Sequence, residues 1–170
     1  MLDIFLAYDN SDEYWRLRFD DVFGRLFKCH QVSPMDLQAE TGEDYVERLT
    51  TSGMLNRETV MVVLIGPKAF ASKKLDWEIS AALEKKSGRP TGIVPVRLPN
   101  HEDHGKSKVS PKRFPIRIVD NLHSGFLKLY DWTESSKELQ SRLYAAEKDS
   151  RTKPNKADNS RSLMKRDMFL

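Results

Sequence analysis

Short apolar runs alternate along the chain with segments whose apolar residues recur at helical spacing. Residues 3–8 (DIFLAY) form the first run and predict a buried strand. Asn10 or Ser11 then suits the start of a helix, with Asp12 and Glu13 in its first turn, where acidic side chains are favourable. The apolar stripe of that helix consists of Trp15, Phe19, Val22, Phe23, Leu26 and Phe27.

The middle of the chain repeats this alternation. Residues 28–32 predict a short strand that ends at a Ser-Pro turn, and residues 43–55 predict a helix. Residues 59–65 (TVMVVLI) are continuous and β-branched, which predicts a central strand covered on both faces. A helix over residues 75–86 and a strand over residues 92–98 (GIVPVRL) follow, and Pro95 indicates that this strand lies at an edge or contains a bulge.

The last third of the chain is less regular. Residues 100–112 are polar and predict a loop, and the dipeptides at 120–121 and 124–125 indicate a turn. Residues 126–130 predict a last strand, and residues 133–148 predict a closing helix that Thr133 caps. We therefore expect an α/β fold, with a mostly parallel sheet between two helical layers and right-handed crossovers.

The charge distribution divides the chain at residue 148. Residues 1–148 hold 22 basic and 22 acidic residues, and residues 149–170 hold 6 basic and 3 acidic ones. We expect one folded domain over residues 1–148 and a basic, disordered tail over residues 149–170, in which LMKRDMFL is a candidate docking segment. The balanced body argues against a nucleic-acid partner, whose binding would need clustered Lys and Arg.

Composition bears on the cellular compartment, on disulfide formation and on metal binding. No apolar run reaches the roughly 20 residues of a membrane span, and the N-terminus lacks the basic leader of a signal peptide, so we expect a cytoplasmic protein without a membrane partner. The single cysteine, Cys29, cannot form an internal disulfide. His30 adjoins it, but no second pair at ligand spacing follows, so no metal is expected.

Parallel sheets bind ligands at the carboxyl ends of their strands, which directs attention to four loops. The loop after Tyr8 reads DNSDEY and holds no glycine, which excludes a dinucleotide fingerprint or a P-loop there. No serine or cysteine has the context of a nucleophile elbow, so a hydrolase triad has no support.

Glu78, in the predicted helix after the strongest strand, is the main candidate. The apolar stripe of this helix is Leu75, Ile79, Ala82 and Leu83, and Glu78 falls on its shoulder. A carboxylate there can point into the cleft, where partial burial raises its pKa, but the spacing equally fits a solvated charge at the border of the core. Trp77 lies opposite the stripe and fits a pocket wall, a partner contact or an irregular helix start.

Other polar residues have two interpretations each. Asp9 and Asn10 follow the first strand, where a ligand would lie, but either also suits a helix cap. Asp36 follows a Ser-Pro turn and fits turn chemistry as well as a site. The loop histidines lack ligand spacing, so exposure is the default expectation.

Four segments, in order, resemble the TIR-like domain family over about residues 3–148. FLAYDNSDEYW resembles its opening strand and acidic loop, and TVMVVLIGPKAFASKKLDWEIS resembles its central strand and the W-E-I helix. GIVPVRLP and FPIRIVDNLHSGFLKLYDW are similar to the final segments of the bacterial subfamily found in Thoeris-type anti-phage defence.

The resemblance implies a flavodoxin-like fold and an enzyme that cleaves the nicotinamide–ribose bond of NAD. NAD would be the substrate, with no separate cofactor, and the product a cyclic or conjugated ADP-ribose signal that reaches an effector protein by diffusion. Glu78 matches the family's catalytic glutamate, Tyr8 and Asp9 would lie at the cleft mouth, and Trp77 would shape its wall. Activation by assembly into a homo-oligomer is implied as well.

Two departures from the family pattern bear on activity. Lys74 stands four positions before Glu78, where the subfamily often has an aromatic residue, and Ala7 stands where serine is common. Two alternative functions therefore remain open: a non-catalytic TIR module that recruits partners through its helices and tail, and an enzyme like the nucleoside deoxyribosyltransferases, which share the architecture and also use a glutamate.

Overall fold

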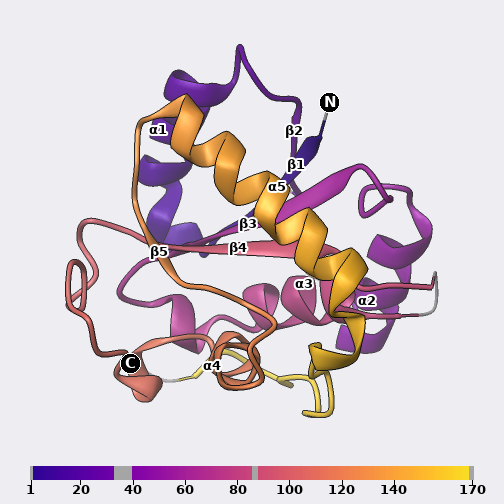
Figure 1. Cartoon of the computed structure of the whole chain (residues 1–170). Coiled ribbons are helices and arrows are strands. Elements are labelled where there is room, and N and C mark those ends of the chain that lie inside the picture. Colours follow the sequence, from indigo (N-terminus) through magenta and orange to yellow (C-terminus); the bar gives the residue numbers. More distant parts are fainter. Residues whose placement is uncertain (1, 33–39, 86–87, 169–170) are drawn as a thin grey trace.

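The computed structural model describes residues 2–32, 40–85 and 88–168. These residues form a five-stranded parallel sheet in the order β2-β1-β3-β4-β5 (Figure 1), which confirms the predicted flavodoxin-like α/β fold. The strands are β1 (Asp3–Ala7), β2 (Cys29–His30), β3 (Thr59–Ile65), β4 (Gly92–Arg97) and β5 (Tyr130–Asp131).

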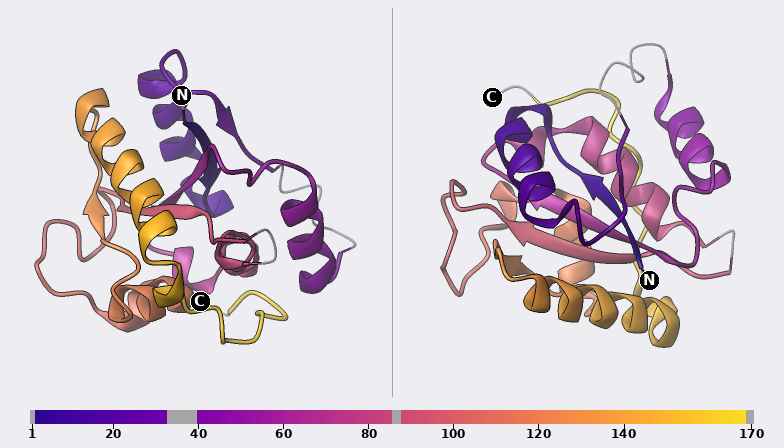
Figure 2. Two further views of the ribbon diagram at one scale, coloured as in Figure 1. Left: turned by 45° about the vertical axis from the view of Figure 1, so that its right-hand side comes forward. Right: turned by 90° about the horizontal axis from the view of Figure 1, so that it is seen from above.

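Helices cover both faces of the sheet, because alternate side chains of each strand point to opposite sides. One face packs under α2 (Gly42–Thr51), α3 (Lys73–Leu83) and α4 (Ile116–His123), and the other under α1 (Glu13–Phe23) and α5 (Ser136–Thr152). Figure 2 shows α5 on one side of the sheet and α2 and α3 on the other. The 3-10 turns are η1 (Asn10–Asp12), η3 (Ala69–Ala71), η4 (Pro111–Arg113) and η5 (Pro154–Lys156).

β3, the strand predicted most strongly from its composition, lies at the centre of the sheet as expected. β3 pairs with β1 on one side and with β4 on the other, and all seven of its residues are buried. Met61, Val63 and Ile65 contribute to one core and the residues between them to the other. A continuous β-branched run is therefore diagnostic of the central strand here.

Pro95 was expected to mark an edge strand or a bulge, and both alternatives are wrong. β4 lies between β3 and β5, and its pairing with β3 runs without interruption from Gly92 to Arg97. The Leu98 amide donates to the Ile65 carbonyl oxygen of β3. Because successive amides along a strand point to opposite sides, the amide position of Pro95, three residues earlier, faces β5. β5 pairs only with Val96 and Arg97, so the ladder with β5 begins after Pro95. The missing N–H of Pro95 therefore costs the sheet no hydrogen bond.

Residues 100–131 differ most from the prediction. α4 replaces the turn expected near residues 120–121. Of the last strand expected over residues 126–130, only Tyr130 belongs to β5, which pairs Tyr130 and Asp131 with β4. His101, expected to be exposed, is buried: its Nε2 lies 3.0 Å from the Arg113 carbonyl oxygen, and its Nδ1 accepts the Asp103 amide at 3.0 Å. These polar contacts organise the loop before α4.

The C-terminal part also corrects the sequence-based boundaries. Ser135, rather than Thr133, caps α5 by accepting the Glu138 amide at 3.2 Å, and the helix continues to Thr152. The tail was expected to be disordered, whereas the yellow segment in Figure 1 follows a defined path beside α4. It is held by polar contacts to α3 and α4, which hydrophobic periodicity does not register.

Among the described residues, no helix has the length and apolar composition of a membrane span. Asp36 and the Ser-Pro turn before it lie outside the described residues, so the prediction for Asp36 stays a prediction.

Candidate active site

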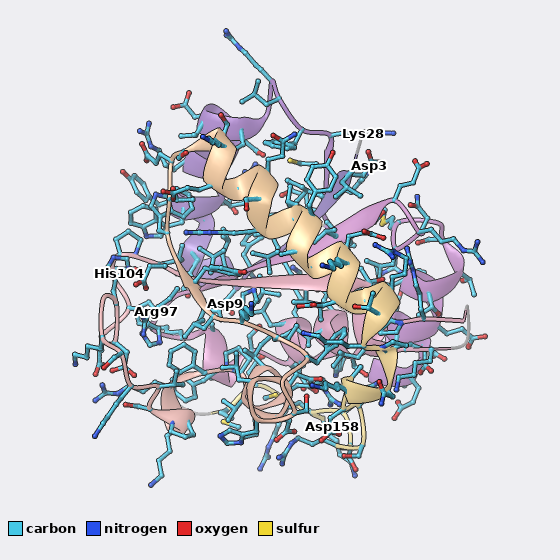
Figure 3. All side chains as sticks on the ribbon, in the orientation of Figure 1. Asp3, Asp9, Lys28, Arg97, His104 and Asp158 are labelled. Carbon is cyan, nitrogen blue, oxygen red and sulfur yellow. The ribbon has the colours of Figure 1, made fainter. Side chains whose placement is uncertain are left out.

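The strand order reverses between β1 and β3, which places the ligand-binding edge of this fold at their carboxyl ends. The loop after β1 leads through η1 into α1, and the loop after β3 leads through η3 into α3. Figure 3 shows Asp9, Arg97 and His104 toward this end of the sheet, and Asp3 and Lys28 at the opposite end.

Helix α3 begins at this edge and is buried along nearly its whole length. Ser72 caps it, with its hydroxyl accepting the Leu75 amide at 3.3 Å. Glu78 is 0% exposed, which excludes the interpretation of this residue as a solvated charge at the core border. A wholly buried carboxylate requires specific partners, because desolvation of a charge is costly.

The two oxygens of Glu78 differ in their surroundings. Oε1 accepts a hydrogen bond from the Tyr45 hydroxyl of α2 at 2.9 Å and pairs with Lys74 Nζ at 3.0 Å. Oε2 is buried and has no hydrogen-bond partner among the described residues. One oxygen is therefore fixed in place while the other keeps its full capacity to accept a hydrogen bond.

The ionisation of Glu78 reflects opposing influences. Burial raises the pKa of the Glu78 carboxyl, and the Lys74 ammonium together with the hydrogen bonds from Lys74 and Tyr45 lowers it, with a net rise. Burial, reinforced by the Glu78 charge, likewise raises the pKa of the Tyr45 hydroxyl, so Tyr45 remains a hydrogen-bond donor. The Glu78 carboxylate, held by Tyr45 and Lys74, thus has a higher proton affinity than an exposed glutamate.

Lys74 connects Glu78 to the end of the first strand. Its Nζ lies 3.4 Å from the Tyr8 carbonyl oxygen and 4.9 Å from the centre of the Tyr8 ring. Tyr8 is buried, and burial together with the nearby Glu13 carboxylate raises the pKa of its hydroxyl to about 12. The structure therefore brings Tyr8 within one side chain of Glu78, and the prediction that Tyr8 lies at the cleft mouth stays a prediction.

Trp77 is buried between α2 and the C-terminal segment. Its ring centre lies 5.8 Å from that of Tyr45, and its Nε1 donates to the Met164 carbonyl oxygen at 2.7 Å. The helix stripe did not explain Trp77, because its partners come from α2 and from residues far along the chain. Trp77 touches the group that holds Glu78, and the prediction that it contacts substrate stays a prediction.

Asp9 takes the capping role that was one of its two interpretations. Its Oδ2 accepts the Ser11 amide at 3.0 Å and a second hydrogen bond from the Ser11 hydroxyl, at the start of η1. It stands at the carboxyl end of β1 and remains partly exposed, which leaves its predicted place at the cleft mouth open.

Asp12 is a second buried carboxylate at this edge of the sheet, and sequence reasoning did not single it out. It is 1% exposed and packs against Gly66, where a Cβ would lie 2.0 Å from Asp12 Oδ1. Oδ2 is buried without a partner among the described residues. Burial and the Asp9 charge raise the pKa of Asp12 to about 6, although a hydrogen bond from the Gly66 backbone lowers it. First-turn acids are usually solvated, so the sequence held no signal of this burial.

A second polar cluster closes the same edge beyond β4. Arg97 donates from Nε and Nη2 to the two Asp131 oxygens at 2.6 and 3.1 Å, and His104 Nδ1 lies 3.4 Å from Asp131 Oδ1. The Arg97 guanidinium lowers the pKa of the Asp131 carboxyl against the effect of its burial. This cluster fastens β5 and the preceding loop to β4.

Other candidate locations are less suited to catalysis. A cavity of about 280 Å³ lies at the amino ends of β3 and β4, far along the strands from Glu78, and it is lined by residues such as Asn56, Arg57, Arg89 and Glu147. Within the described ranges, no group of three or more His, Cys, Asp or Glu side chains could hold a metal ion.

No curated protein matches the chain. Among solved structures, one match is to the TIR domains in the structure of the activated Roq1 resistosome directly recognizing the pathogen effector XopQ. Its TM-score is 0.41 at 13% identity, covering 94% of this chain and 93% of that chain. The sequence model of one family, described as TIR domain, matches residues 4–146. Because this match spans most of the 170 residues, the chain belongs to the TIR domain family.

Proposed function

We propose that this TIR domain cleaves the nicotinamide–ribose bond of NAD and releases a cyclic or conjugated ADP-ribose signal in anti-phage defence. The observation that carries the proposal is the buried carboxylate of Glu78, near the switch point where the strand order reverses between β1 and β3. Its Oε1 is held by two donors, and its Oε2 has no partner among the described residues. A group so placed, with a perturbed pKa, is typical of an active site.

The chemistry requires little more than a fixed negative charge. The bond between C1′ of the ribose and the nicotinamide nitrogen breaks, its electron pair neutralises the pyridinium ring, and positive charge develops on the ribose. Oε2 would accept a hydrogen bond from a ribose hydroxyl, which places the carboxylate beside the developing positive charge. In a site shielded from water, the carboxylate then stabilises that charge. A nucleophile then bonds to C1′ and loses its proton to solvent: a group of the nucleotide itself gives the cyclic product, and a group of a second acceptor molecule gives the conjugate. NAD is consumed as substrate, with no separate cofactor.

Access to Glu78 bears on regulation. NAD cannot reach a carboxylate that is 0% exposed, so the side chains of α2 and α3 around it must move before turnover. This fits an enzyme that is inactive at rest and becomes active on homo-oligomeric assembly after infection. The diffusible product would then reach an effector protein, which would be the downstream partner.

A second candidate function is a non-catalytic TIR interaction module. The buried ion pair between Lys74 and Glu78 favours it, because a carboxylate that neutralises a neighbouring ammonium has a structural role without any substrate. In that case the helices and the C-terminal segment would recruit partners, and NAD would remain intact.

NAD turnover with and without a phage-infected lysate as activator separates the two functions. We expect the activated protein to release nicotinamide and Glu78→Gln to lower that rate by about 100-fold or more, because the charge beside the developing cation is lost. Glu47→Gln, which changes an exposed glutamate of α2, is the matched control and keeps the wild-type rate.

Two results would contradict the proposal in different ways. NAD that stays intact under both conditions would favour the interaction module. Nicotinamide release that persists in a correctly folded Glu78→Gln variant, verified by circular dichroism, would show that another residue carries the reaction.

A further inference from the structure

Residues 157–168, here called the C-terminal strap, lie beyond the part of the chain that matches the TIR family, yet they cross the helices that carry the candidate site. The strap starts beside α4, where the Asp158 amide donates to Asn121 Oδ1 at 2.8 Å and Asn121 Nδ2 donates to the Asp158 carbonyl oxygen at 2.8 Å. Figure 3 places Asp158 near α4, and from there the strap runs to the start of α3.

Arg117 of α4 joins the strap to α3. It is 0% exposed, and its Nε and Nη2 donate to the two Asp76 oxygens at 2.9 and 3.3 Å. The remaining hydrogen bonds go to the strap: Nη1 donates to Asn159 Oδ1 and the Arg161 carbonyl oxygen, and Nη2 to the Ser162 carbonyl oxygen, at 2.8 to 3.1 Å. The strap therefore supplies the acceptors that a buried guanidinium needs.

The next contacts lead directly to the group that holds Glu78. The Met164 amide donates to Asp76 Oδ2 at 2.8 Å, and the Met164 carbonyl oxygen accepts from Trp77 Nε1 at 2.7 Å. Trp77 lies against Tyr45, whose hydroxyl donates to Glu78. One residue of the strap is thus two side chains away from the candidate carboxylate.

The strap also bridges α3 and α2. A Cβ at Gly42, the first residue of α2, would lie 2.8 Å from Trp77 Nε1 and 3.1 Å from Leu163 Cδ1. Leu163 therefore packs where the start of α2 meets α3. A segment that contacts both helices restrains their separation, which access to Glu78 requires.

The strap is attached in a manner that permits release. Most of its side chains are exposed or only partly buried, and its backbone amides and carbonyls make most of the contacts. The Lys73 amide donates to Asp167 Oδ1 at 2.8 Å and the Met168 amide to the Ala71 carbonyl oxygen at 3.0 Å, at the far end of the strap. Segments with little buried apolar surface open at low free-energy cost.

We propose that the surface formed by α3, α4 and the start of α2 is a peptide-docking site that the chain's own strap occupies, and that the docked strap is autoinhibitory. The Asp76–Arg117 pair binds the extended backbone, and Trp77 transmits its presence to Tyr45 and Glu78. Release of the strap lets α2 and α3 separate and admits substrate to Glu78; this regulatory part rests on the proposed NAD-cleaving function.

The test uses the full chain with a double substitution in the strap, Asn159→Ala with Leu163→Asp, which replaces no fully buried residue of the core. Hydrogen exchange measured by mass spectrometry should show at least a tenfold faster exchange over residues 157–168 and faster exchange over α2 and α3. Nicotinamide release without activator should rise several-fold. Lys165→Ala, at an exposed position of the strap whose side chain makes no hydrogen bond or ion pair to the described residues, is the control and should behave as wild type.

The outcomes separate the inference from the proposed function. Faster exchange in the strap with unchanged exchange in α2 and α3 overturns the docking coupling, whatever the activity. Faster exchange in all three segments, with wild type active and no rise in basal turnover, overturns autoinhibition. If no variant consumes NAD even with activator, the proposed function fails together with the regulatory claim, and the peptide-docking site is then decided by the exchange data alone.

Discussion

At the scale of single residues, the switch point holds two buried carboxylates that are compensated differently. Glu78 has the Lys74 ammonium at 3.0 Å, whereas no described cation is recorded in an ion pair with Asp12, which instead has Asp9 as a like-charged neighbour. Both keep one oxygen without a partner among the described residues. Asp12 therefore carries a larger uncompensated desolvation cost when it ionises.

The pKa of Asp12 makes stability depend on pH. Since its folded-state pKa is about 6 and its ordinary value is 3.8, the folded protein binds more protons than the unfolded chain between these values. The Asp12 contribution to the free energy of unfolding should therefore fall by about 2 kcal/mol as pH rises from about 4 to about 6. Denaturant unfolding of wild type and Asp12→Asn across this range measures the difference.

Asp12→Asn should lose this component of the slope, so its stability relative to wild type rises with pH. Asp44→Asn, at an exposed position of α2, serves as the control and should follow the wild-type curve. Parallel curves for wild type and Asp12→Asn would show that the carboxyl does not titrate within this range in the folded protein.

At the scale of elements, the strands and helices with a clear period were predictable and those fixed by polar contacts were not. β3 has the predicted limits, because burial on both faces requires an uninterrupted apolar run. α4 was missed, because Arg117 and Asn121 lie on its buried side and their partners are in the strap, about forty residues later. β5 is short because only Tyr130 and Asp131 pair with the end of β4.

The candidate site was likewise predictable where periodicity determines it and unpredictable where side-chain contacts determine it. Periodicity and the preceding strand placed Glu78 at the start of a core helix, but its burial depends on Tyr45 from α2 and on Lys74 reaching the end of β1. Lys74 was noticed only as a departure from the family pattern. Its pairing with Glu78 joins side chains one turn apart in α3, and the spacing permits this contact but does not dictate it.

The contact between α5 and β4 yields a prediction at this scale. A Cβ at Gly92 would lie 2.6 Å from the Ala146 carbonyl oxygen of α5, and backbone cannot yield as a side chain does. Gly92→Ala should therefore displace α5 and lower the free energy of unfolding by about 2 to 3 kcal/mol. Thr91→Ala, which adds no atom toward α5, should change it by less than about 1 kcal/mol in the same denaturant titration. Equal stability of Gly92→Ala and wild type would mean that α5 seats less closely.

At the scale of the whole molecule, the two cores share one strand. β3 contributes alternate side chains to both helical layers and pairs along its length with β1 and β4. β2 and β5 pair over two residues each, and the strap is held mainly by backbone hydrogen bonds. Stability should therefore be highest at β3 and lowest at the two outer strands and the strap.

This gradient predicts the order of amide exchange in the native protein. The amides of β3 should exchange only through global unfolding, because opening β3 disrupts both layers at once. Those of β2, β5 and the strap should exchange orders of magnitude faster through local opening that costs only part of the global free energy. Native-state hydrogen exchange at increasing denaturant concentration measures both the free energy and the denaturant dependence of each opening. If β3 amides exchanged as readily as those of β5, the two layers would open independently, and release of the strap could no longer be treated as a local event within a rigid domain.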